Sequence, residues 1–207
     1  CAKAQEVIVA ITNGYATLAE VKSALRVTDS VDDTLIENAI EGASRRIDGY
    51  CGRWFYKSPS TAISIYPIDN YNISVDDIAN TTVIVKTDND GDGTFETTLT
   101  QGTDYQLEPL DAVLRGRPFR RIVAIGGKTF PIQMQPNQAL CQVTAYWGWD
   151  AVPDDVREAC VLLSMRGFAR LNSALGVVGF ADMAFQVRAV DPDVRDLLSP
   201  YKIMGLA

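Results

Sequence analysis

The chain has 207 residues, of which 47% are hydrophobic and 22% are charged, which is the composition of a globular protein. Nineteen basic against 26 acidic residues leave a net charge of −7, which disfavours tight wrapping around nucleic acid. The sequence contains no histidine, which excludes Ser-His-Asp and Cys-His nucleophiles and histidine metal ligands. No segment reaches the roughly 20 apolar residues of a membrane helix. Four scattered cysteines without CxxC spacing favour a reduced compartment.

The N-terminal part of the chain has helical periodicity. Thr17 and Glu20 form the T-x-x-E pattern of a capping box, which predicts a helix that begins at Thr17 and ends near Val27. An acidic turn follows over residues 28–33. The next segment, residues 33–52, repeats apolar residues at helical spacing and predicts the clearest helix of the chain.

The pattern changes to period two between Ala62 and Trp149, which indicates a β-rich region. The predicted strands are Ala62–Tyr66, Thr82–Lys86, Thr94–Leu99, Tyr105–Leu107, Arg121–Ile125 and Leu140–Trp147. Asp88–Gly93, with the sequence DNDGDG, predicts a hairpin turn, because Asp-Gly pairs tolerate positive φ.

Helical periodicity returns in the last part of the chain. A long helix is predicted from Pro153 to about Leu171, with apolar residues on two sides, so that it is expected to be buried on two sides. A short helix is predicted over Asp191–Ser199, and an apolar tail, Tyr201–Ala207, follows it. The order of elements therefore predicts an α+β protein. It consists of a small bundle of three main helices plus a short C-terminal helix, with an inserted β-rich subdomain.

The DNDGDG turn, Asp88–Gly93, is the one candidate metal site. Asp88, Asp90 and Asp92, with Glu96 as a further ligand, imitate the start of an EF-hand loop, in which alternate carboxylates surround Ca²⁺. The twelfth position, which needs a bidentate Glu, is Leu99, and no helices flank the loop. A solvated hairpin tip is therefore the favoured interpretation, and the prediction is no cofactor and no metal.

Three other motifs have simple structural interpretations. The run from Gly126 to Thr129 (GGKT) lacks the first glycine and the following helix of a phosphate-binding loop, and indicates a β-turn. Four arginines could contact DNA phosphates or an acidic neighbouring subunit, but an exposed edge strand guarded by charge is favoured; they are Arg115, Arg117, Arg120 and Arg121. Trp147 and Trp149 are expected to anchor the core, with an interface as the alternative. No catalytic site is evident, so the protein is predicted not to be an enzyme.

Three stretches, taken in order, resemble the head–tail connector family of long-tailed bacteriophages, also called head-completion or adaptor proteins. The first runs from Tyr15 through the acidic turn to Phe55 and ends in IDGYCGRWF. The second is Tyr146–Ala159 (YWGWDAVPDDVREA), and the third is Asp191–Tyr201 (DPDVRDLLSPY). Residues 1–207 are accordingly expected to form a single connector domain, with 15–56 and 150–207 as its helical part. The β-rich insertion, 60–148, departs from the smallest family members, and its contacts are left open.

The resemblance implies a structural virion protein that forms a ring below the portal, joins the DNA-filled head to the neck or tail and extends the DNA channel. The implied partners are the portal protein, a neck, stopper or tail protein, and further copies of the chain, commonly twelve. DNA would pass through without specific binding, and no membrane is involved. The protein is expected in the virion neck, and in the host cytoplasm during assembly.

Two sets of residues follow from this resemblance. A subunit interface is expected on the third long helix, at Val161, Leu162, Met165 and Phe168. Portal docking is expected along the C-terminal segment, at Val194, Leu197, Leu198, Tyr201, Ile203 and Leu206.

Other classes remain open on the sequence. One alternative is another neck component, a stopper or tail terminator, although these are mainly β. A second is a metal-stabilised surface or lipoprotein module that uses Cys1 and the acidic turn. An enzyme that works through carboxylates alone is a third.

Overall fold

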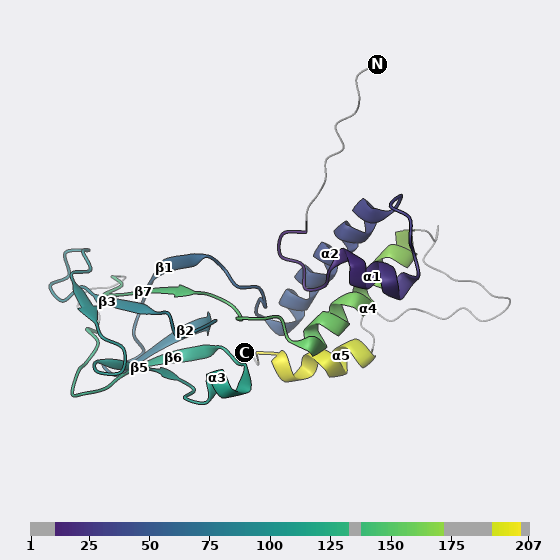
Figure 1. Cartoon of the computed structure of the whole chain (residues 1–207). Coiled ribbons are helices and arrows are strands. Elements are labelled where there is room, and N and C mark those ends of the chain that lie inside the picture. The colour runs from purple at the N-terminus through teal and green to yellow at the C-terminus, as the bar shows by residue number, and fades with distance from the viewer. Residues whose placement is uncertain (1–10, 133–137, 172–191, 204–207) are drawn as a thin grey trace, which may run out of the picture. The chain divides into compact units, whose positions relative to one another are not determined.

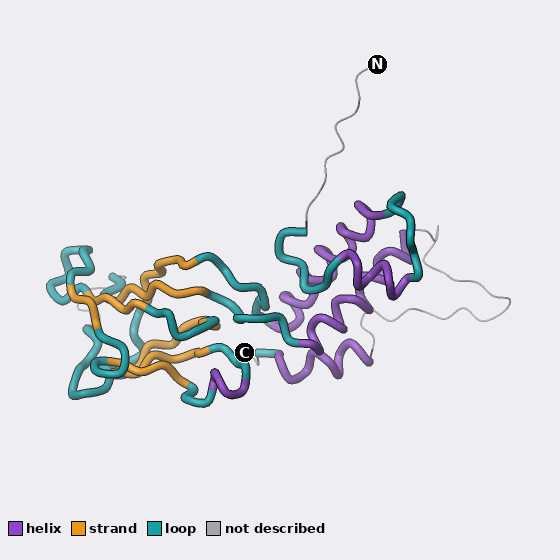
Figure 2. The backbone as a smooth tube through the Cα atoms, in the orientation of Figure 1, coloured by secondary structure: helices purple, strands orange, loops and turns teal. Residues whose placement is uncertain are grey.

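The computed structural model describes residues 11–132, 138–171 and 192–203 (Figure 1). The chain divides into two compact units. The helical unit combines residues 1–55 with residues 152–207, and the β unit comprises residues 56–151. Figure 2 shows the strands together in the β unit and the long helices together in the helical unit. This organisation confirms the predicted α+β class, a helical bundle with an inserted β-rich segment.

Four α-helices and a short 3₁₀ helix make up the described part of the helical unit. They are α1 (Leu18–Leu25), α2 (Asp33–Cys51), α4 (Asp154–Leu171), α5 (Pro192–Leu198) and the 3₁₀ helix η1 (Ser199–Tyr201). The predicted capping box is present, because the Glu20 amide donates to Thr17 Oγ1 at 3.2 Å and the Thr17 amide donates to Glu20 Oε2 at 2.7 Å. The four predicted helices are thus confirmed, and each observed boundary lies within two residues of the predicted one. Asp191, the expected cap of the last helix, lies outside the described residues.

The core of the helical unit forms where α4 packs against α1, α2 and α5. The buried residues of α2 recur at helical spacing, as the sequence predicts: Ile36, Ile40, Ala43, Ser44, Ile47 and Cys51. The buried face of α4 contains Val156, Ala159, Cys160, Ser164 and Phe168. Ser44 is tolerated there because its hydroxyl donates to Ile40 O at 2.8 Å and accepts from the Tyr15 amide at 3.0 Å.

The β unit contains two antiparallel sheets and one short helix. Its elements are β1 (Ser60–Ile65), β2 (Asn72–Ile78), β3 (Ile84–Thr87), β4 (Thr97–Leu99), β5 (Tyr105–Glu108), α3 (Ala112–Arg115), β6 (Phe119–Ala124) and β7 (Cys141–Tyr146). One sheet has the order β1-β7-β3-β4, and the other has the order β2-β6-β5. Residues alternate between buried and less buried along β5 and β7, as expected for strands with one covered face.

The predicted hairpin is confirmed. β3 pairs antiparallel with β4, with Thr87 opposite Thr97, and the DNDGDG turn connects them. The predicted turn at Gly126 and Gly127 is also present. Both glycines have positive φ, and the Lys128 amide donates to Ile125 O at 3.0 Å.

Two elements of the β unit are not among those predicted. β2 has the sequence NISVDDI, and its inward positions are Ile73, Val75 and Asp77. A buried carboxylate in the inward register interrupts the apolar alternation by which strands are recognised. The second missed element is α3, whose four residues are too few to show helical periodicity.

Among the described helices, none combines the length and the apolarity needed to span a membrane.

Candidate functional site

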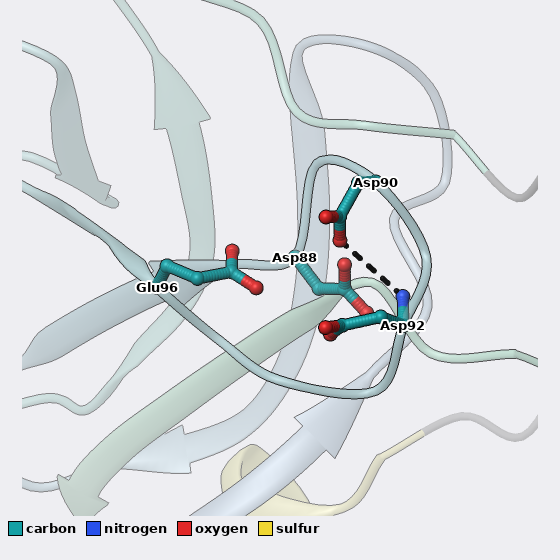
Figure 3. A group of neighbouring side chains, drawn as sticks. All are labelled: Asp88, Asp90, Asp92 and Glu96. Atoms are coloured by element: carbon teal, nitrogen blue, oxygen red, sulfur yellow. Dashed lines mark hydrogen bonds between the residues drawn. The ribbon is translucent and has the colours of Figure 1, made fainter.

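The acidic loop between β3 and β4 brings together the four carboxylates that the sequence singled out. One ligand oxygen from each of Asp88, Asp90, Asp92 and Glu96 lies within 4.8 Å of the others (Figure 3). Asp88 is buried, whereas the other three side chains are exposed. The tight turn places alternate residues on the inside of the loop, and this is why Asp90 and Asp92 face the carboxylate of Asp88.

Hydrogen bonds within the loop already occupy the carboxylate of Asp88. Its Oδ1 accepts from the Gly91 amide at 2.7 Å, and its Oδ2 accepts from the Gly93 amide at 2.8 Å. Burial acts to raise the pKa of Asp88, but the bonds from Gly93 and Gly91 outweigh it and hold the pKa below its ordinary value. The charged carboxylate therefore holds the hairpin tip through these two amide bonds. Asp90, Asp92 and Glu96 remain as ligands for Ca²⁺, and its binding stays a hypothesis.

The arginine run lies on α3, on the loop after it and on β6. β6 is the middle strand of its sheet, so the interpretation of this run as an edge strand is wrong. The sequence could not reveal this, because the partner strand β2 was not recognised. Arg120 Nε lies 3.6 Å from Asp77 Oδ1, and Arg121 Nη1 lies 3.6 Å from Glu108 Oε2.

An open pocket of about 460 Å³ lies beside these two arginines. Its lining includes Asp69 and Glu108 together with Arg120 and Arg121. The lining thus holds two acidic and two basic groups, which gives no clear preference for an anion such as phosphate.

The two tryptophans are core residues, as predicted. Trp147 and Trp149 are almost fully buried. Trp149 Nε1 donates to Asp77 Oδ2 at 3.1 Å, and the Gly148 amide donates to Asp77 O at 2.7 Å. Asp77 thus has a structural role, since it joins β2 to the segment after β7.

The predicted interface residues on α4 occupy two environments. Phe168 is buried within the helical unit. Val161, Leu162 and Met165 are only half-buried. The apolar surface that α4 leaves partly uncovered in a single chain therefore includes these last three side chains, together with the equally half-buried Leu163.

The predicted docking segment lies against its own helical unit. Val194 and Leu198 are buried, whereas Leu197, Tyr201 and Ile203 are half-buried. The amide of Ile203 donates to the carbonyl of Cys51 at 2.9 Å. Leu206 lies outside the described residues. The uncovered part of this segment is therefore smaller than the sequence indicates.

Three aromatic rings connect the segment before α1, the segment after α2 and the 3₁₀ helix η1. Phe55 packs edge-to-face against Tyr15 and against Tyr201, and both pairs of ring centroids are 5.7 Å apart. The Tyr15 hydroxyl accepts from the Phe55 amide at 2.8 Å and donates to Asp48. Sequence reasoning did not single out this cluster, whose three rings are separated by 40 and 146 positions along the chain.

The described cysteines are structural rather than reactive. Burial raises the pKa of Cys51 to about 11 and that of Cys141 to about 12, and it also raises the pKa of Cys160. A thiol that stays protonated at neutral pH is a poor nucleophile. Cys1, on which the lipoprotein alternative depends, lies outside the described residues.

One protein family has a model that matches part of this chain. The family model described as "Phage gp6-like head-tail connector protein" matches residues 15–83. This segment contains the first of the three stretches that carry the resemblance, so the resemblance to head–tail connectors is confirmed. The matched segment is about a third of the chain, and over that segment the chain is similar to head–tail connector proteins. No curated protein matches the sequence significantly.

Two solved structures share the fold over almost the whole chain. One is from "Neck of empty GTA particle computed with C6 symmetry", with a TM-score of 0.57 and 17% identity. The other is from "Virion of native gene transfer agent (GTA) particle", with a TM-score of 0.52 and 17% identity. Each match covers 97% of this chain and 95% of the other. The fold similarity therefore includes the β unit, which lies largely beyond the segment that the family model matches.

Proposed function

We propose that this protein is a non-enzymatic neck component that forms a ring below the portal and extends the DNA channel toward the tail. The family match over residues 15–83 carries the proposal. The fold similarity to a neck chain over 97% of this protein supports it. That neck was computed with C6 symmetry, which is compatible with a ring of twelve copies.

A ring requires surfaces that a single chain leaves uncovered. Three of the half-buried apolar side chains of α4 supply one such surface for a neighbouring subunit: Val161, Leu162 and Met165. Leu197, Tyr201 and Ile203 supply a second, which we assign to the portal. Because both surfaces belong to the helical unit, the portal and the neighbouring subunit would bind the same unit.

The charge of the protein suits a channel through which DNA moves. A net charge of −7 repels the DNA backbone, so the duplex would pass without adhering to the wall. We expect no duplex binding at physiological salt. A tight, salt-sensitive complex would contradict this part of the proposal.

Electron microscopy of the purified protein, alone and with a portal ring, tests the proposal. We expect rings, or ring-shaped additions to the portal. Val161→Asp should block assembly while leaving circular dichroism unchanged, whereas Glu158→Asp, at an exposed position on the same helix, should assemble normally. Portal binding that survives substitution of Leu197 and Ile203 by Asp would remove the C-terminal segment from the docking surface. A protein that stays monomeric with and without a portal would refute the ring.

A further inference from the structure

The loop between β5 and β6 exposes three large aliphatic side chains. Leu110, Val113 and Leu114 are 73%, 70% and 89% exposed. Val113 and Leu114 lie in the single turn of α3, and Leu110 lies two residues before that turn. Single exposed aliphatic residues are ordinary, but three within five residues of one turn are typical of an interaction surface.

The turn that carries these side chains is held in place. Ala112 is fully buried beneath it, and its amide donates to Pro109 O at 3.0 Å. The Arg117 amide donates to Ala112 O at 2.9 Å, and Asp111 pairs with Arg115 across the turn. A fixed apolar surface loses little conformational entropy when it is covered, and this favours binding.

The arginines beside the turn are mostly neutralised within their own chain. Arg115, Arg120 and Arg121 each face a carboxylate of the β unit. Arg117 is exposed and forms no ion pair among the described residues. Leu110, Val113, Leu114 and Arg117 together form what we call the α3 surface, with an apolar centre and one unpaired positive charge. A DNA phosphate backbone would leave its aliphatic centre uncovered, so nucleic acid is a poor occupant.

A second surface, in the helical unit, also combines exposed aliphatic side chains with charged ones, but its charges are negative. Val31, in the turn before α2, is 86% exposed, and Leu35, in the first turn of α2, is 42% exposed. Asp29 and Asp32 lie beside them, and the Asp32 side chain makes no capping hydrogen bond. We call Asp29, Val31, Asp32 and Leu35 the α1–α2 loop surface.

We propose that the α3 surface of one copy docks on the α1–α2 loop surface of the next copy in the ring. A closed ring needs two different, complementary patches on each subunit, because its contacts are head-to-tail. These two patches are apolar at the centre and opposite in charge at the edge, as protein interfaces are. This contact rests on the proposed ring and adds to the contact proposed on α4.

Cross-linking between two differently tagged chains tests the contact directly. One chain carries Leu114→Cys and the other Val31→Cys, both in a Cys1→Ser background, because the three described native cysteines are buried. Mild oxidation of the mixture should give a disulfide-linked pair that contains both tags. Ile84→Cys, at another exposed aliphatic position of the β unit, serves as the matched control and should give no such pair with Val31→Cys.

Charge reversal supplies a second, independent readout. Arg117→Glu and Asp32→Arg should each weaken self-association about tenfold, and the two changes combined should restore most of it. Mixed cross-linking no greater than that of the control, or no restoration in the double variant, would overturn the contact.

The outcomes separate this contact from the proposed function. Rings without the mixed cross-link would refute the contact and keep the ring. Cross-linked pairs that never close into rings would keep the contact and refute the ring. The absence of both would refute both.

Discussion

Removal of the Tyr15 hydroxyl tests how the aromatic cluster holds the helical unit together. Tyr15→Phe keeps the ring and therefore its edge-to-face contact with Phe55. It removes the acceptor of the Phe55 amide and the donor to Asp48. Phe55 is fully buried, so its amide would lose this acceptor in a place that water does not reach.

The magnitude follows from these two bonds. A buried N–H group that loses its acceptor costs about 1–3 kcal/mol. Asp48 keeps its ion pair with Arg45 at 3.0 Å, and its side chain is 21% exposed, so water can replace the hydroxyl there. The second bond therefore adds less, and we expect a total loss of about 2–3 kcal/mol.

Chemical denaturation at neutral pH, followed by the helical circular dichroism signal, measures this loss. Tyr50→Phe is the matched control, because Tyr50 is on the same helix as Asp48 and its hydroxyl makes no hydrogen bond among the described residues. The control should change stability by less than about 0.5 kcal/mol. Equal stability of the two variants would refute the role given to the Tyr15 hydroxyl.

The pH dependence gives a further check on the same variant. Burial, together with the hydrogen bond to Asp48, raises the pKa of Tyr15 far above its ordinary value of 10.0. Above pH 10 the unfolded chain loses this proton while the folded chain keeps it, so the folded state loses stability as the pH rises. Tyr15→Phe has no hydroxyl proton to lose at this position. The difference in unfolding free energy between the unmodified protein and this variant should therefore shrink above pH 10. If the stability difference between the two proteins stayed constant in strongly alkaline solution, the burial of the hydroxyl would be contradicted.

Three other predictions concern the acidic loop, the cysteines and the Gly126 turn. Calorimetric titration with millimolar Ca²⁺ should give no heat, because amides already occupy Asp88; a heat that disappears in Asp90→Asn would instead establish a cation site. In a Cys1→Ser background, Cys51 should not react with thiol reagents at neutral pH, and rapid labelling of the folded protein would contradict its burial. The free energy of unfolding should also fall as the pH rises from 9 toward 11, because the thiol ionises at lower pH in the unfolded chain than in the folded one. In urea unfolding, Gly126→Ala should destabilise the protein by about 1–3 kcal/mol more than Gly127→Ala. The reason is that a Cβ at Gly126 would clash with Thr103 O, whereas a Cβ at Gly127 meets no atom. Equal losses would show that the loop shifts to relieve the clash.

The helical unit could be predicted closely because its signals are local. The capping box at Thr17, the isoleucine spacing of α2 and the proline before α4 each act within a few residues along the chain. The hairpin tip at Asp88 is local in the same way. The position of Glu96 in the sequence suggested a further ligand beside the three aspartates, and in the structure its carboxylate lies close to theirs.

The parts that could not be predicted depend on residues far apart in the sequence. β2 is a strand because β6 pairs with it, and Asp77 is buried because Trp149 and Arg120 meet it there. The same pairing makes β6 a central strand. The sequence predicts Phe168 at a subunit interface and Val194 at the portal, and both side chains are buried within the single chain. An amphipathic helix can turn its apolar side toward its own chain or toward a neighbour, and its own sequence does not decide between the two.

The sequence alone therefore determined the α+β class, the helix boundaries, the acidic hairpin and the resemblance to head–tail connectors. Capping, periodicity and turn chemistry are short-range interactions that a single segment encodes. Only the tertiary structure decided which apolar surface a single chain covers and which it leaves open, at α3, on α4 and at the start of α2. That outcome depends on the packing of distant segments, because burial belongs to the whole fold and not to any one stretch of it.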